Sequence, residues 1–199
     1  MLAPQSEARA TMSRRPVWKK WAGAIVVAAV VLGALALPPL RHPLALCELL
    51  LIAEPQSLPV PVDGVRQRQI ADTWGGARSG GRRHKGVDIF ASRGTPVRST
   101  TPGIVARVGV VALGGNAISI VGPRLTAHYY AHLDRFGAFR PGDSVASGDV
   151  VGYVGDSGNA KGTPCHLHYG VYHALLWPVD PWPLLGDRRT PGERPAASR

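Results

Sequence analysis

Histidine side chains and one aspartate recur at spacings that would let them bind a metal ion. Six of the seven histidines lie between positions 84 and 173, so the enrichment belongs to one region. Residues two or four apart on a β-strand face the same side, which lets His84 converge with Asp88 and His166 with His168. Two imidazoles and a carboxylate suit Zn²⁺ and leave a fourth position for water. The pattern predicts a catalytic metal site, and His132 supplies a further imidazole from the same region.

The structural alternative is that these side chains only satisfy hydrogen bonds inside a core. A lone histidine or a single His-x-His pair is more often structural than a ligand. Here the alternative would require five buried polar side chains in one small domain, and each would need a partner. The combination therefore favours a metal site.

The elements that must position these residues are expected to be short strands. The chain has 24 glycines and 18 prolines among 199 residues, with many short apolar runs between them. No segment of the region shows a 3.6-residue apolar period over ten residues. The sequence predicts a mainly β, antiparallel domain with strands near 86–90, 96–99, 103–111, 117–121, 126–132, 150–154 and 167–172.

The N-terminal region is expected to meet a membrane. A basic stretch at 14–20 precedes an uncharged run at 21–40, and twenty helical residues would span about 30 Å. We expect an uncleaved transmembrane anchor in the inner membrane, with the C-terminal domain in the periplasm or outside the membrane. The alternative is a cleaved signal peptide ending near Ala34-Leu35-Ala36, which would make the protein secreted.

Composition divides the chain into five expected parts. These are a cytoplasmic basic tail (1–20), the anchor or signal segment (21–40), an apolar and then Pro-rich linker (41–64), a folded domain (65–185) and a disordered tail (186–199). Two cysteines exclude a disulfide framework and a cysteine-based zinc finger. The sequence leaves the oligomeric state open.

Positive charge is concentrated beside the predicted site. The net charge is +10, and nine basic residues stand against two acids between positions 66 and 107. A basic rim would attract an anionic substrate. Nucleic acid is not an expected partner, because the domain is expected to be exported and carries no nucleic-acid motif or basic stripe with interleaved aromatics.

Five short motifs follow one another in one part of the chain: HKGVDIFA (84–91), GTPV (94–97), YYAHLD (129–134), GDVVGYVG (148–155) and GNAKGTPCHLHY (158–169). With these motifs in this order, residues 81–180 resemble the M23 family of zinc metallopeptidases, the LytM or lysostaphin type. The resemblance implies a two-sheet β fold with one zinc ion in a groove, held by His84, Asp88 and His168. It further implies that His132 and His166 are catalytic, and that the substrate is a peptidoglycan stem peptide or cross-link.

The chemistry of such a site needs a base for the attacking water and an acid for the leaving amine. A bound zinc ion lowers the pKa of its water from about 16 toward about 7. No His-Glu-x-x-His helix is present to supply a glutamate. His132 and His166 can fill both roles, because imidazole titrates near neutrality, and the sequence does not divide the roles between them.

Three further residues are candidates for substrate binding. Arg78 precedes His84 in a glycine-rich loop, and Asn116 and Tyr130 lie close to the motifs. Surface, turn and core roles respectively are the structural alternatives.

Two other functions compete with the peptidase. One is a non-catalytic relative that binds the wall or activates another hydrolase; such relatives usually lack a zinc ligand, and none is missing here. The other is a biotinyl or lipoyl carrier, suggested by the stretch 141–151, which contains no lysine to modify.

Overall fold

The structure, a computed structural model, describes residues 38–186, which begin with helix α2 (Pro38–Leu51). By contacts the chain divides into Met1–Pro43 and Leu44–Arg199, and the predicted site belongs wholly to the second unit. Pro38 and Pro39 occupy the first turn of this helix, where a missing backbone N–H costs no helical hydrogen bond. Within the described part of the chain, no helix is long and apolar enough to cross a membrane. Most of the predicted anchor and the tail from 187 lie outside the described residues.

Short strands make up most of the second unit. They are β1 (Leu58–Pro59), β2 (Val87–Phe90), β3 (Pro96–Arg98), β4 (Gly103–Val111), β5 (Gly115–Val121), β6 (Ala127–Phe136), β7 (Ser144–Val145), β8 (Val150–Val154), β9 (His166–His173), β10 (Trp177–Val179) and β11 (Leu185–Gly186). Single 3₁₀ turns occupy Gln67–Gln69, Ser79–Gly81, Pro123–Leu125, Gly158–Ala160 and Trp182–Leu184. The prediction of a mainly β domain is confirmed.

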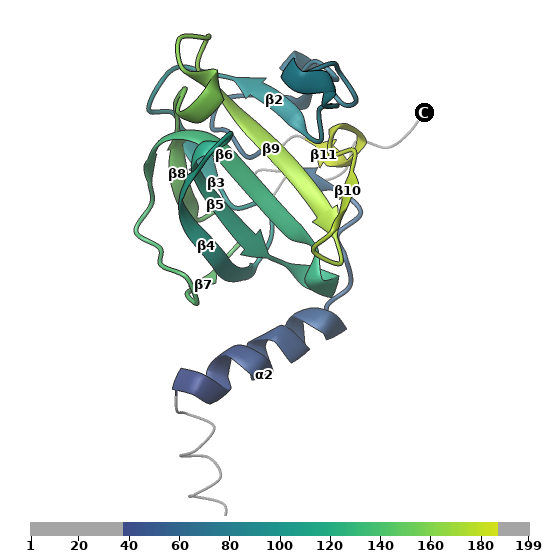
Figure 1. Ribbon diagram of the computed structural model, residues 1–199. Coiled ribbons are helices and arrows are strands. Elements are labelled where there is room, and N and C mark those ends of the chain that lie inside the picture. Colours follow the sequence, from purple (N-terminus) through teal and green to yellow (C-terminus); the bar gives the residue numbers. More distant parts are fainter. Residues whose placement is uncertain (1–37, 187–199) are drawn as a thin grey trace, which may run out of the picture. The chain divides into compact units, whose positions relative to one another are not determined.

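Nine strands form one antiparallel sheet, in which β9 and β6 are the central pair (Figure 1). The main order is β10-β9-β6-β5-β4-β7; β2 pairs with the first half of β9, and β8 pairs with both β3 and β6. A second, two-stranded sheet joins β1 and β11 in parallel. The predicted antiparallel character therefore holds for the large sheet, and the small sheet closes the ends of the domain on each other.

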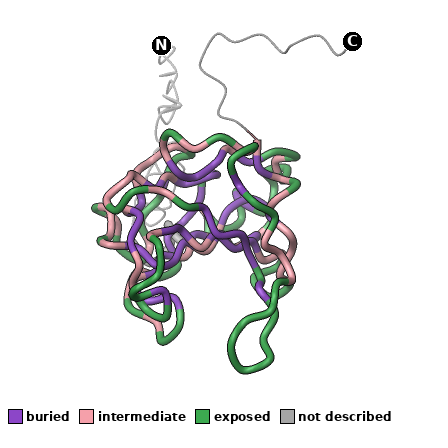
Figure 2. Tube along the Cα trace, turned by 90° about the horizontal axis from the view of Figure 1, so that it is seen from above, coloured by how far each residue is buried: buried purple, intermediate pink, exposed green. Residues whose placement is uncertain are grey.

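Side chains alternate along β9, so that one face of the strand packs in the core and the other carries the predicted site residues. Leu167, Tyr169 and Val171 are fully buried in the core, whereas His166 and His168 point to the other side. Buried residues gather in the middle of the trace and exposed residues at its periphery (Figure 2).

The core begins before the expected domain start at residue 65. Leu58, Val60 and Val62 come from the Pro-rich stretch that the sequence assigns to a linker, yet at most 3% of each is exposed. The pairing of β1 with β11 draws this stretch into the domain.

A polar cluster lies inside the core at the start of β6, where His128 precedes His132 by four residues. His128 Nδ1 lies 2.8 Å from the Tyr169 hydroxyl and 3.2 Å from Thr100 Oγ1, which in turn lies 2.9 Å from the Tyr130 hydroxyl. Burial lowers the pKa of His128 to about 4 and raises those of both tyrosines, because the charged forms lose their hydration. This cluster accounts for His128 and Tyr130 structurally.

We expect His128 to make the domain sensitive to acid. Its pKa is lower in the folded state than the ordinary 6.5, so its contribution is fully present above about pH 6.5 and is lost as the pH falls toward 4. The contribution should be on the order of 2–3 kcal/mol. Urea unfolding of the wild type and His128→Gln at pH 7.5 and 5 measures it. The variant should lose less stability between the two pH values; equal losses would contradict the assignment.

Candidate metal centre and active-site cleft

Three side chains bring one donor atom each to a common point. His84 Nε2 and His168 Nδ1 lie 2.8 Å apart, and each lies 3.2 Å from Asp88 Oδ1. Donor atoms around one tetrahedral zinc ion, at about 2.0–2.2 Å from it, are separated by about 3.3–3.5 Å. Among the described residues these three form the group that could hold a metal. Their spacing and their donor types fit zinc.

The register of two strands places two of the three ligands. Asp88 on β2 is the direct antiparallel partner of His168 on β9. Gly86 lies under the His168 ring, and a Cβ there would come within 2.8 Å of its Cε1 and 2.5 Å of the Tyr169 carbonyl oxygen. Glycine at 86 therefore leaves the room that the ring and the neighbouring strand occupy.

His84 reaches the centre from the loop before β2, not from the strand that the spacing suggested. Its Nδ1 donates to the Thr73 carbonyl oxygen at 2.7 Å, which leaves Nε2 with a lone pair for a metal. The Thr73 hydroxyl accepts the Asp88 backbone N–H at 3.1 Å. Thr73 therefore fixes the first two ligands, and no pattern in the sequence marks it.

Asp88 also carries an ion pair on its second oxygen. Arg78 Nη2 donates to Asp88 Oδ2, while Oδ1 faces the two imidazoles. Burial alone would raise the pKa of Asp88, but hydrogen bonds with His168 and His84 outweigh it and hold the pKa well below the usual range. Arg78, a predicted substrate-binding residue, thus contacts a ligand while also lining the cleft.

His132 and His166 stand beside this centre with their rings 5.0 Å apart, and the His132 ring lies 5.9 Å from that of His168. His132 Nδ1 donates to the Ser157 carbonyl and His166 Nδ1 to the Pro164 carbonyl, each at 2.8 Å. Because a carbonyl only accepts, each neutral ring keeps its lone pair on Nε2. Burial lowers the pKa of His132 to about 4, so this ring is neutral at pH 7 and able to accept a proton.

The backbone of His132 is strained. Its φ of 62° lies in the left-handed region, which costs a non-glycine residue about 1–3 kcal/mol. The strain coincides with a bulge: residues 130 to 133 of β6 face residues 118 to 116 of β5, so β6 has one extra residue there. The bulge turns His132 toward the cleft and takes the next carbonyls out of the regular ladder.

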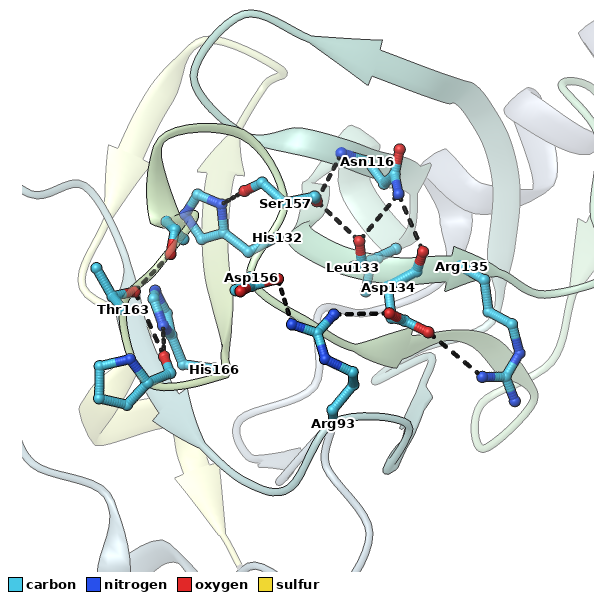
Figure 3. A network of polar contacts seen from close by, with 12 residues as sticks. Arg93, Asn116, His132, Leu133, Asp134, Arg135, Asp156, Ser157, Thr163 and His166 are labelled. Carbon is cyan, nitrogen blue, oxygen red and sulfur yellow. Dashed lines mark hydrogen bonds and ion pairs between the residues drawn. The ribbon is translucent and has the colours of Figure 1, made fainter.

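Asn116 and Ser157 bind the carbonyls that the bulge displaces (Figure 3). Asn116 Nδ2 donates to the carbonyl oxygens of Leu133 at 3.0 Å and Asp134 at 3.1 Å. Ser157 Oγ donates to Leu133 at 2.7 Å and accepts the Asn116 backbone N–H at 2.9 Å. Asn116, a predicted substrate-binding residue, therefore uses its amide N–H groups to bind the backbone beside His132.

Arg93 ties the same two segments together from the outer side (Figure 3). Its guanidinium bonds Asp134 at 2.8 Å and Asp156 at 2.5 Å. Asp134 follows the bulge, and Asp156 precedes the residue whose carbonyl holds His132. Because half of the Arg93 side chain is exposed, we regard it as a modest reinforcement.

A cleft of about 760 Å³ runs over the three candidate metal ligands and over His132 and His166, the two predicted catalytic histidines. Its basic lining residues are Arg78, Arg82, Arg83 and Lys85, and its one acidic lining residue is the ligand Asp88. Tyr130 is fully buried in the polar cluster of the core and does not line the cleft, whereas Tyr129 does. The four predicted histidines and the predicted aspartate thus lie together at the cleft, whereas Tyr130 lies in the core.

The zinc affinity of single variants should distinguish the candidate ligands from the neighbouring histidines. We expect His168→Ala and Asp88→Ala to weaken zinc binding by more than about 100-fold, because each removes one of three donors. His132→Ala should bind zinc within about threefold of the wild type. Competition with a chromogenic chelator measures both. An equal loss in His132→Ala would mean that His132 is a ligand.

If the chain has the peptidase activity that the sequence predicts, Asn116→Asp should lower the kcat of peptide hydrolysis about 10- to 100-fold. KM and zinc affinity should stay within about threefold of the wild type. The change keeps the shape of the side chain but removes both N–H donors, so the bulge that presents His132 loosens. The control Ser119→Ala, on the same strand, should change neither. In the double variant Asn116→Asp/His132→Ala, kcat should fall no further than in His132→Ala; an additive fall would contradict a role through His132.

Comparison with known proteins agrees with this geometry. The peptidase family M23 model matches residues 82–181. The L-Ala–D-Glu endopeptidase of Bacillus subtilis is 46% identical over 124 residues, which are 57% of this chain and 38% of that protein. The chain therefore spans well under two thirds of the length of this curated relative.

Two solved structures are similar as well. Helicobacter pylori Csd3 has a TM-score of 0.54 at 28% identity, covering 68% of this chain and 36% of that one. A zinc-containing peptidase from Vibrio cholerae has a TM-score of 0.50 at 29% identity, covering 59% and 37%. With the family model matching half of its residues, the chain belongs to peptidase family M23.

Proposed function

We propose that the protein is a zinc-dependent endopeptidase that hydrolyses peptide bonds in the stem peptides or cross-links of peptidoglycan. The observation that carries this proposal is the convergence of His84 Nε2, Asp88 Oδ1 and His168 Nδ1 within 3.2 Å of one another, in an open cleft. Each chain would hold one zinc ion at these atoms.

When bound there, zinc would supply Lewis-acid polarisation of a carbonyl and acidify a water molecule. The chain's own contribution is a pair of imidazoles, His132 and His166, whose Nε2 atoms are free to accept a proton. One can take the proton of the attacking water at Nε2, and the same ring, then protonated, can return this proton to the leaving amine. Their carbonyl partners keep both rings in the tautomer that this transfer needs.

The cleft favours an anionic peptide. Four basic side chains line it, and the carboxylate of Asp88 is already paired with Arg78 and the two histidines. Peptidoglycan stem peptides carry free carboxylates, which such a lining would attract. The similarity to an L-Ala–D-Glu endopeptidase makes that stem-peptide bond our first choice of substrate.

The proposed setting is the outer side of the inner membrane, with residues 21–40 as the anchor; cleavage of this segment would release the domain. The basic stretch at 14–20 would remain in the cytoplasm.

Digestion of purified peptidoglycan by the full chain tests the function, with mass identification of the released fragments. We expect zinc-dependent release that His84→Ala reduces at least about 100-fold, because the substitution removes a ligand. The control His173→Ala removes a histidine from the far end of β9 and should leave release unchanged. The fragment masses distinguish cleavage within the stem from cleavage of a cross-link.

Absence of release by zinc-loaded wild type, or release that His84→Ala leaves unchanged, would defeat the proposal. Wall binding without release would instead favour the non-catalytic alternative, a protein that binds the wall or activates another hydrolase.

A further inference from the structure

An apolar hairpin tip follows the end of β9 that is opposite to His166 and His168. The hairpin joins β9 to β10, with Trp177 paired to His173 (Figure 1). Its tip exposes 48% of Leu175, 75% of Leu176 and 71% of Trp177. Three consecutive large apolar side chains in water are costly to a protein and usually mark an interaction site.

The turn holds these side chains outward in a strained conformation. Ala174 and Leu175 have φ values of 46° and 65°, in the left-handed region that hairpin turns normally fill with Gly, Asn or Asp. An L-residue is destabilised at such an angle, because its Cβ comes too close to the following carbonyl oxygen. Strained turns that display a bulky apolar residue occur where the display has a use.

The chain enters the domain beside this hairpin. Glu54 Oε1 lies 2.9 Å from His173 Nε2 and 3.0 Å from Thr126 Oγ1, and Arg124 Nη1 donates to the Leu50 carbonyl at 3.1 Å. Here too apolar side chains face solvent, with 42% of Leu50, 85% of Leu51 and 43% of Ile52 exposed. We call these three residues and Leu175, Leu176 and Trp177 the apolar end.

We propose that the apolar end is a membrane-docking surface that inserts its side chains into the interfacial layer of the bilayer. The proposal rests on the proposed anchor, because only nine residues, 41–49, separate the uncharged run at 21–40 from residues 50–54, so an anchored chain would keep this end of the domain near the lipid. Tryptophan is enriched at membrane interfaces, and leucine side chains are stabilised when their apolar area leaves water.

Docking in this orientation would direct the cleft away from the bilayer. His168 lies five residues before His173, the last residue of β9, which corresponds to about 17 Å of strand. The metal centre would then lie at the end of this strand that is away from the lipid surface and open toward the wall. The hairpin would thus orient the domain so that its cleft faces the substrate.

The test uses the full chain in phosphatidylethanolamine/phosphatidylglycerol vesicles. A nitroxide is attached to Leu176→Cys, in a background carrying Cys47→Ser and Cys165→Ser. Its matched control is Val110→Cys, a strand position with 72% exposure, on the hairpin whose turn lines the cleft. Collision rates with dissolved oxygen and with an aqueous nickel complex report depth in the bilayer.

We expect the label at 176 to collide with the nickel complex several-fold less, and with oxygen more, than the label at 110. Equal nickel accessibility at the two sites would overturn the docking surface. The docking surface would also be overturned if the label at 176 collided equally rarely with the nickel complex when the chain is kept in solution by an amphipathic polymer without lipid. That result would indicate that protein, and not lipid, covers the label. Failure of the chain to float with the vesicles would overturn the docking surface and the anchor together.

Peptidoglycan release by the same labelled chains is measured in parallel. Because this release depends on the metal centre and not on lipid, its retention separates a failed docking surface from a failed endopeptidase.

Discussion

The antiparallel register between β2 and β9 is the constraint on which the candidate site depends. It sets Asp88 opposite His168, and a slip of one residue would turn one of them toward the core and dissolve the ligand set. The register is held from the core side by the fully buried Ile89, Leu167 and Tyr169. Hydrophobic packing on one face of the sheet therefore fixes the positions of the candidate metal ligands on the other.

A second constraint governs the protonation of the site. Nδ1 of His84, His132 and His166 donates a hydrogen bond to a backbone carbonyl in each case. The carbonyls belong to Thr73, Ser157 and Pro164 respectively. Carbonyls from loops thus decide that Nε2 is the free nitrogen in all three rings. For His84 that atom faces the metal position, and for the other two it is available for proton transfer.

The domain separates its two kinds of exposed surface along β9. The strand begins at the histidines of a basic cleft and ends at an exposed apolar hairpin, so one strand connects the surface proposed to bind anionic peptides with the surface proposed to meet lipid. Left-handed φ angles occur beside both surfaces, at His132 of β6 next to the cleft and at Ala174 and Leu175 in the hairpin. Both are places where the chain accepts a conformational cost to direct a side chain outward.

Sequence alone determined the donor types, the β class and the family resemblance, because side-chain alternation and short motifs are local properties of the chain. Only the tertiary structure showed that His84 lies in a loop, that Arg78 pairs with Asp88 and that Asn116 binds the backbone beside His132. Thr73 and Ser157 had no recognisable signal, since the atoms that matter most are their main-chain carbonyls. A carbonyl is common to every residue type, so its partner follows from the way that distant loops pack and not from the letters of the sequence.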